Sequence, residues 1–455
     1  LLGLAVGCLA LTLCVCAVTL VGAGAGWFFY SERAGLFSSS TPRPTRDPAA
    51  TPRPAPTPGP EALSEMGAIE AWVIQQRGLQ PNGDGIQRKF LSEEEVYDRT
   101  IQDFQEDTSP EEIQDDVRVL SVLGLLRPDL DLYDLYLRLY SEGVAGFYDP
   151  DTGELVVVSE AGQLNAYERT TYAHEYNHAL QDQNYDLRGM GFSDEGWEAD
   201  SENAAAVQAL LEGDSTLLDE QYQATLTAAE RREYDRVLDS FDVSIYLELP
   251  DFLLQDFFFP YQQGRDFVER YYDQGGWARV DEVWRDPPTS TEQILHPEKY
   301  DQREDPLPVP RPALTATLGA GWRLLEQNNM GEWYTYLILA YGEDSDARLS
   351  TGRAERAAAG WGGDSYTAFY NDAQDQTVLA LHTHWDSIDE ADEFAAAFAD
   401  YADERFNRRV DFPGGQCWEG AELHCFFSAG AHTLWLAAPD QATIEALRGA
   451  YPDLD

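Results

Sequence analysis

The sequence predicts a mixed α+β fold, mainly helical in its first globular part and richer in strands in its second. Capping residues followed by amphipathic stretches recur through residues 61–305, where one short turn also joins two apolar segments. From residue 306 onward, apolar runs of strand length alternate with helical stretches. We therefore expect a mainly helical domain with one β-hairpin over 61–305 and a small α+β domain over 306–455.

Residues 1–31 are predicted to be a transmembrane anchor or an export signal. No charged side chain occurs in residues 1–30, a length that crosses the roughly 30 Å of bilayer hydrocarbon. The aromatic run at 27–30 is typical of a membrane interface and favours a retained single-pass anchor. Small residues at 23–25 resemble a signal-peptidase site, so secretion after cleavage stays open. Because Arg33 is the lone basic residue just after the span, the acidic bulk is expected outside the cytoplasm, and a cytoplasmic location is favoured less.

Residues 32–60 are predicted to be a linker between the membrane and the folded part. Pro, Thr, Ser and Ala dominate this stretch. Such a composition favours extended polyproline conformations and cannot bury a core.

The composition argues against a nucleic-acid partner. The chain has 81 Asp and Glu against 31 Lys and Arg, a formal net charge of -50. Nucleic-acid phosphates would be repelled by this charge. Only Lys89 and Lys299 are lysines, so Arg supplies nearly all the positive charge. This pattern resembles salt-adapted proteins, although GC-rich coding produces the same bias.

Two capped N-termini are expected near the start of the folded part. Ser92 with Glu95, and Ser109 with Glu112, have the spacing of capping boxes ahead of amphipathic stretches. A third helix is expected at 130–140. These helices are expected to brace the helix that carries the chemistry.

A β-hairpin is predicted next. Apolar segments at 143–148 and 154–158 flank the sequence Asp-Pro-Asp-Thr-Gly at 149–153, whose residue types close tight turns. An exposed strand in this hairpin could pair with an extended peptide backbone.

An HExxH run lies in a stretch that is predicted to be helical over 164–185. Residues four apart share one face of an α-helix, so His174 and His178 can place two imidazole nitrogens on one zinc ion. Glu175, one step round the helix, can reach a metal-bound water as general base. Only seven His occur in the chain, so chance placement at this spacing is rare. The alternative is a helix with two surface His.

A catalytic zinc needs a third protein ligand beside one open position. No further His occurs before His296, so the candidates are carboxylates of the helical stretch 197–218. Glu212 is favoured, because neighbouring Ala residues let two helices approach and Gly213 would leave room beside the metal. Asp214 could then hydrogen-bond a ligand imidazole. Acidic residues are abundant, so two alternatives stay open on the same stretch: Glu202 and Glu198.

Residues 174–182 (His-Glu-Tyr-Asn-His-Ala-Leu-Gln-Asp) resemble the active-site helix of the thermolysin-like gluzincins, whose third zinc ligand is a downstream Glu. Residues 290–300 (Ser-Thr-Glu-Gln-Ile-Leu-His-Pro-Glu-Lys-Tyr), preceded by Gly-Gly-Trp at 275–277, are similar to a little-characterised group of bacterial and archaeal proteins regarded as metallopeptidases. The similarity spans about 144–300. It includes the tail of the motif helix, which places Asp182 among the residues expected to support the ligands.

The resemblance implies a zincin-like fold, a zinc cofactor and peptide-bond hydrolysis. It also implies a substrate-binding edge strand, which the hairpin would supply, and a second catalytic group that stabilises the oxyanion. His296 is the candidate for that group, since an imidazolium could donate a hydrogen bond there. A His that caps a helix or fills a core gap is the equal alternative. Tyr176 and Asn177 stand where the gluzincin motif usually has an apolar residue and Thr, but neither position binds metal.

Further helices are expected at 228–241 and in the aromatic-rich stretch 252–272. The Phe-Phe-Phe-Pro run at 257–260 is expected to pack in the core, with a place in a substrate pocket as the alternative.

The C-terminal domain is expected to begin with a Pro-rich lead and a helical stretch that ends at Leu339. His382 and His384 share one strand face and could bind metal, but without a nearby third ligand a solvated face is favoured. The expected strands are 366–370, 378–385, 423–428 and 433–438, and the expected helices are 387–403 and 440–449.

Cys417 and Cys425 are the only cysteines of the soluble part. Their close spacing could close a disulfide loop in an exported domain, whereas unlinked core thiols are the alternative.

Two functions of different classes follow from these patterns. The first is a membrane-anchored, extracytoplasmic zinc metallopeptidase that cleaves peptide or protein substrates through a zinc-bound water activated by Glu175. The second is a zincin-fold protein with little or no turnover that acts as an extracellular binding or scaffold module. Chelator-sensitive proteolysis would separate the two.

Overall fold

The computed structural model describes residues 58–83, 85–140, 146–150, 152–158, 164–241, 244–406 and 408–454. Within these ranges the chain is a mixed α+β protein, as the sequence predicts. The predicted anchor and nearly all of the predicted linker lie outside the described residues. No helix in the described part is long and apolar enough to cross a membrane.

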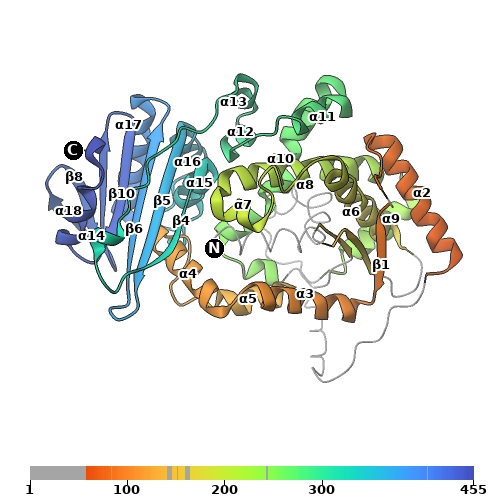
Figure 1. Cartoon of the computed structure of the whole chain (residues 1–455), viewed down its shortest axis with the longest axis horizontal. Coiled ribbons are helices and arrows are strands. Elements are labelled where there is room, and N and C mark those ends of the chain that lie inside the picture. Colours follow the sequence, from red (N-terminus) through yellow and green to blue (C-terminus); the bar gives the residue numbers. More distant parts are fainter. Residues whose placement is uncertain are drawn as a thin grey trace.

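The first part of the molecule is mainly helical (Figure 1). Both predicted capping boxes are formed, because Ser92 Oγ accepts a hydrogen bond from Glu95 N at 3.1 Å and Ser109 Oγ accepts one from Glu112 N at 3.2 Å. The helices before the motif are α2 (Pro60–Arg77), α3 (Glu93–Asp107), α4 (Pro110–Leu123) and α5 (Leu132–Tyr140). Those after them are α6 (Ala166–Asn184), α7 (Asp194–Ala199), α8 (Ser201–Gln223), α9 (Ala228–Leu238), α10 (Asp251–Gly275), α11 (Trp277–Trp284), α12 (Thr291–Leu295) and α13 (Pro297–Gln302), with a 3-10 turn at Ile245–Leu247.

A three-stranded sheet lies beside these helices. The described part of the predicted hairpin is confirmed as β2 (Gly146–Asp149) and β3 (Glu154–Val158), while residues 143–145 lie outside the described residues. A strand that the sequence did not predict, β1 (Gln87–Leu91), pairs in parallel with β3. The strand order β1-β3-β2 leaves β2 at an edge of the sheet.

Helix α8 packs against both α6 and α10. The predicted helix over 197–218 is interrupted at Asp200, which ends α7 and caps the start of α8. A Cβ at Gly213 would lie 2.2 Å from the carbonyl oxygen of Gly264 in α10. Gly213 therefore permits a close approach to α10 and does not leave room beside a metal, which corrects the sequence-based expectation.

The second part of the molecule is built on a seven-stranded antiparallel sheet with the order β4-β5-β6-β10-β9-β8-β7. The four predicted strands are confirmed, whereas three strands were not predicted. One of them, β4, occupies a stretch predicted to be helical, and only α15 matches the helix expected before Leu339. The strands are β4 (Arg323–Asn328), β5 (Trp361–Asn371), β6 (Gln376–Trp385), β7 (Arg408–Phe412), β8 (Gly415–Glu419), β9 (Leu423–Ala429) and β10 (His432–Ala438).

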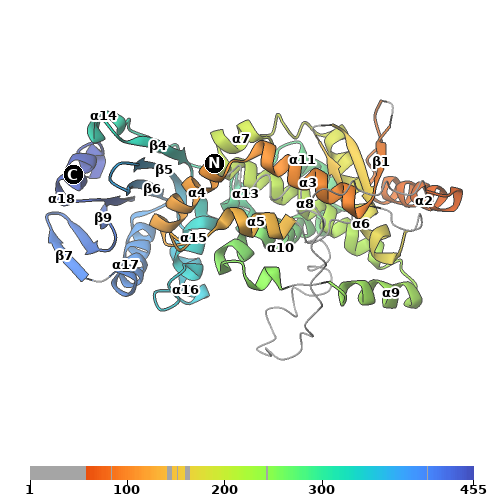
Figure 2. The same cartoon turned by 90° about the horizontal axis from the view of Figure 1, so that it is seen from below.

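Helices cover both faces of this sheet, with α17 and α16 on one side and α14 with α18 on the other (Figure 2). The α18 face has its own apolar core, which includes Leu434, Leu436 and Ile444. Cys417 and Cys425 face each other on β8 and β9 and are joined by a disulfide. The helices of this part are α14 (Thr315–Leu318), α15 (Gly331–Tyr341), α16 (Thr351–Ala358), α17 (Ile388–Arg405) and α18 (Gln441–Arg448), with a 3-10 turn at Pro452–Leu454.

The two parts share one continuous apolar core. Helix α4 contacts strands β4 and β6 of the large sheet. Arg405 of α17 donates hydrogen bonds to the carbonyl oxygens of Val122 and Leu123 at the end of α4, both at 3.0 Å. Positive charge at a helix C-terminus is favourable, so this contact helps to fix the sheet on the helical part.

Candidate metal centre

Asn165 begins the helix that carries the HExxH run. Its Oδ1 accepts hydrogen bonds from the backbone nitrogens of Tyr167 at 2.9 Å and Glu168 at 3.0 Å, while the Glu168 carboxylate accepts one from Asn165 N at 2.8 Å. This capping box starts α6, which matches the predicted helix closely.

The two motif imidazoles converge on a carboxylate from α8. His174 Nε2 lies 2.9 Å from His178 Nε2. Glu212 Oε2 lies 3.4 Å from His174 Nε2 and 3.3 Å from His178 Nε2. Ligands about 2.0–2.2 Å from a tetrahedral zinc lie roughly 3.3 Å from one another, so a small widening of the imidazole pair would admit the ion.

All three of these side chains are buried, with exposed fractions of 0 % for His174, 5 % for His178 and 1 % for Glu212. Burial of two imidazoles and a carboxylate is costly unless the groups are paired or bind a metal. The donor set of two nitrogens and one oxygen is one that zinc accepts. The residues therefore fit the zinc site that the sequence predicts.

The alternative ligands lie elsewhere. Glu202 accepts hydrogen bonds from the backbone nitrogen and the hydroxyl of Thr291, both at 2.9 Å. It lies ten residues before Glu212 on α8, roughly 15 Å along the helix axis. Glu198 is exposed on α7. Glu212 is thus the carboxylate that the fold brings to the two imidazoles.

His178 is oriented through its other ring nitrogen. Its Nδ1 lies 2.8 Å from Gln181 Oε1 and 3.2 Å from Ser215 Oγ. Gln181 is fixed in turn, because its Nε2 donates to the carbonyl oxygen of Leu211 at 3.2 Å. With Gln181 Oε1 as acceptor, Nδ1 carries the proton, and the lone pair of Nε2 is directed toward Glu212.

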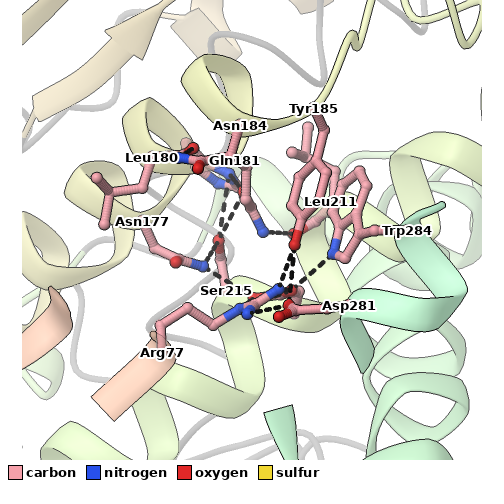
Figure 3. Close-up of polar contacts among 12 residues, drawn as sticks. Arg77, Asn177, Leu180, Gln181, Asn184, Tyr185, Leu211, Ser215, Asp281 and Trp284 are labelled. Atoms are coloured by element: carbon pink, nitrogen blue, oxygen red, sulfur yellow. Dashed lines mark hydrogen bonds and ion pairs between the residues drawn. The ribbon is translucent and has the colours of Figure 1, made fainter. Parts of the chain in front are cut away.

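Asp214 does not hydrogen-bond an imidazole, which corrects the sequence-based expectation. It accepts hydrogen bonds from Arg77 Nη2 at 2.7 Å, from Trp284 Nε1 at 2.8 Å and from Asn177 Nδ2 at 3.0 Å. Asn177 also donates to Ser215 Oγ at 2.9 Å (Figure 3). The buried Arg77–Asp214 pair therefore reaches His178 only through Asn177 and Ser215.

The charges of the cluster compensate one another. Burial alone would raise the pKa of Glu212, but the His178 and His174 rings lower it to about 2. Burial alone would lower the pKa of His178, but the Glu212 carboxylate raises it to about 9. Burial and the charge of His178 lower the pKa of His174 to about 4. The metal-free cluster is thus a buried ion pair with a neutral imidazole beside it, and a cation can replace the proton.

Glu175 lies beside the two imidazoles. One of its carboxylate oxygens and the two ring nitrogens lie within 4.8 Å of one another. Its Oε2 accepts a hydrogen bond from Tyr148 N at 2.9 Å, while its Oε1 has no partner among the described residues. Burial raises the pKa of Glu175 to about 7. A carboxylate with a pKa near neutrality can accept and return a proton in turnover.

Strand β2 is held against the motif helix at two points. Tyr148 N donates to Glu175, and the Tyr148 hydroxyl donates to Asp182 Oδ2 at 2.7 Å. Asp182 therefore positions Tyr148 and contacts none of the candidate ligands. The contacts place the free edge of the small sheet beside the base, where the resemblance implies a substrate-binding strand.

The structure places His296 apart from this cluster. Its Nε2 lies 2.8 Å from Glu332 Oε1, and no hydrogen bond or ion pair among the described residues joins it to the motif. It follows α12, which starts at Thr291 beside Glu202, at the far end of α8 from Glu212. The buried Glu332 carboxylate holds the imidazole, and this pairing argues against the oxyanion role.

Some supporting residues were not singled out from the sequence. Gln181 follows His178 by three positions on the same helix face, so helical spacing could have identified it. Arg77 and Ser215 had no such signal, because their roles depend on how α2 and α8 pack against α6.

Comparison with known proteins gives one match. Residues 322–448, which contain most of the large sheet, are similar to a family described as "Domain of unknown function (DUF8575)". No curated protein and no solved structure matches the chain.

Proposed function

We propose that this chain is a zinc-dependent metallopeptidase with a zincin-like catalytic domain. The observation that carries the proposal is the convergence of His174, His178 and Glu212 at separations that suit one zinc ion. The position of Glu175 next to the same nitrogens adds a base. Three ligands from two buried helices leave one coordination position for water or substrate.

The chemistry divides between the ion and the protein. When bound, zinc would polarise a peptide carbonyl and make water a better nucleophile near neutral pH. Glu175 would take the proton from the attacking water and return it to the leaving amine. The hydrogen bond from Tyr148 N keeps one carboxylate oxygen in place, while the other is free to receive the proton.

The substrate is expected to be an extended peptide. Strand β2 has no neighbour on its outer side within its sheet, and a peptide backbone can add to such an edge. Tyr148 links this edge to α6, so a peptide paired with β2 would pass close to Glu175.

We also propose that the folded part lies outside the cytoplasm. The Cys417–Cys425 disulfide supports this location, since such bonds persist in oxidising compartments. The high negative charge is compatible with a soluble domain tethered at a membrane surface.

The proposal is tested by the cleavage of unfolded casein by the full-length chain in mild detergent. We expect cleavage that a chelator stops and that added Zn²⁺ restores. The Glu175→Gln variant should retain zinc and lose roughly 10²- to 10⁴-fold in turnover, because it removes the base alone. Zinc binding without any cleavage by the wild-type chain would favour the binding or scaffold role instead.

A further inference from the structure

Three of the seven His residues of the chain lie together on one face of the large sheet. His382 and His384 are two residues apart on β6 and therefore point to the same face. His432 of β10 is directly opposite His384 in the antiparallel pairing. We call these three residues the sheet cluster. The sequence favoured a solvated face for His382 and His384 because the third imidazole becomes a neighbour only through strand pairing.

The imidazoles of the sheet cluster are in mutual contact. His382 Nε2 lies 3.2 Å from His432 Nδ1. The ring of His384 stacks on that of His432, with 4.1 Å between ring centroids and 19° between ring planes. Two nitrogens 3.2 Å apart already have the separation of two ligands on one tetrahedral ion. His384 would supply a third nitrogen by rotating its ring out of the stack.

The surroundings of the cluster suit metal entry and retention. His382 is buried with an exposed fraction of 3 %, and the ring of Tyr451 packs edge-on against it. His384 and His432 are only partly buried, so an ion can reach them from solvent. Burial and the neighbouring His432 lower the pKa of His384, which keeps its ring neutral and able to bind a cation.

We propose that His382, His384 and His432 form a second metal site, which binds a late first-row divalent cation such as Zn²⁺, Co²⁺, Ni²⁺ or Cu²⁺. Imidazole is a preferred ligand for these ions, whereas Mg²⁺ and Ca²⁺ require oxygen ligands. The site lies within residues 322–448, the region similar to the family of unknown function. It shares no residue with the helix cluster and does not depend on the proposed peptidase activity.

A bound ion would link the two strands at the centre of the sheet. Strands β6 and β10 are adjacent, with β5 beyond one of them and β9 beyond the other. Binding to the folded state alone stabilises a protein in proportion to the logarithm of metal concentration over Kd. We therefore expect the ion to raise the thermal midpoint of the chain.

The test is a Co²⁺ titration of the metal-free, full-length His174→Ala/His178→Ala chain, followed by visible absorption. We expect one Co²⁺ per chain, with the intense absorption of a low-symmetry, nitrogen-rich site. His432→Gln and His384→Gln, each added to this background, should weaken binding by more than about tenfold, since loss of a direct ligand should cost at least as much as loss of a supporting residue. His296→Gln is the matched control and should leave the titration unchanged.

The same comparison in the wild-type chain covers the case in which the double variant does not fold. There we expect two Co²⁺ per chain, one of which is lost in His432→Gln. Thermal midpoints of the metal-free variants verify folding, and if one of the two Gln variants is unfolded, the other decides. Absence of binding at the sheet cluster, or binding that survives both Gln variants, would overturn the proposal and leave an N–H···N hydrogen bond as the reason for the contact.

Discussion

The two histidine clusters of this chain differ in how the fold assembles and supports them. In the helix cluster, His174, His178 and Glu212 are buried, and the carboxylate compensates positive charge. His178 is additionally held by Gln181 and Ser215. The sheet cluster has three imidazoles, two of them partly exposed, and His384 must rotate to bind. A site whose ligands are fixed in advance binds more tightly, so we expect the helix cluster to hold its ion more strongly.

The largest expected effect follows from removing both motif imidazoles. The His174→Ala/His178→Ala variant should lose all casein cleavage and all zinc at the helix cluster, because one carboxylate alone cannot hold the ion. Metal analysis after gel filtration, against the wild-type chain, measures this loss. Retention of the tightly bound zinc in the variant would show that the stronger site is not the helix cluster.

The third ligand can be tested with two glutamates of the same helix. Glu212→Ala should release zinc and abolish cleavage. Glu202→Ala should keep zinc but lower stability by roughly 1–3 kcal/mol, because it leaves the buried nitrogen and hydroxyl of Thr291 without an acceptor. Zinc content and urea unfolding are measured on both variants. The assignment fails if Glu202→Ala is the variant that releases zinc.

The support of His178 gives a smaller effect. Ser215→Ala removes the hydroxyl near Nδ1 while Gln181 still accepts the proton, so zinc affinity should fall by about tenfold, the lower end of what supporting residues contribute. Competition with a chromophoric chelator measures the change. Ser201→Ala, the same substitution at the start of α8, is the control and should have no effect. Equal affinity in both variants would mean that Gln181 alone orients the ring.

The smallest effect concerns pH. Burial raises the pKa of Glu202 from 4.5 to about 8, so the folded chain retains a proton between these values that the unfolded chain has released. The free energy of unfolding should therefore fall as pH rises through this window, by at most about 1.4 kcal/mol per pH unit for this group. Glu202→Gln has no such proton, and its slope should be correspondingly shallower. Identical slopes in urea unfolding of the two chains would contradict this expectation.

Much of the helix cluster could be predicted because helical spacing is local. His174, Glu175 and His178 are placed by the geometry of one helix, and Asn165 with Glu168 fixes where that helix begins. The sheet cluster could not be predicted in the same way. His432 meets His382 through a pairing between strands fifty residues apart in the chain, and no local pattern encodes that register.

The expectations that the structure corrects also involve long-range packing. Asp214 was expected at an imidazole, yet Arg77 from α2 and Trp284 from α11 occupy its oxygens. His296 was expected near the scissile bond, yet Glu332 of α15 pairs with it. Strand β4 was predicted to be part of a helix, because its few residues gain strand geometry only by pairing with β5.

The central claim is that His174, His178 and Glu212 hold one zinc ion. The most direct measurement is an anomalous difference map, recorded at the zinc absorption edge from crystals of the zinc-loaded chain. We predict a strong peak about 2.0–2.2 Å from His174 Nε2, His178 Nε2 and Glu212 Oε2, and a weaker one at the sheet cluster. A zinc peak at the sheet cluster with none between the two motif imidazoles would contradict the account.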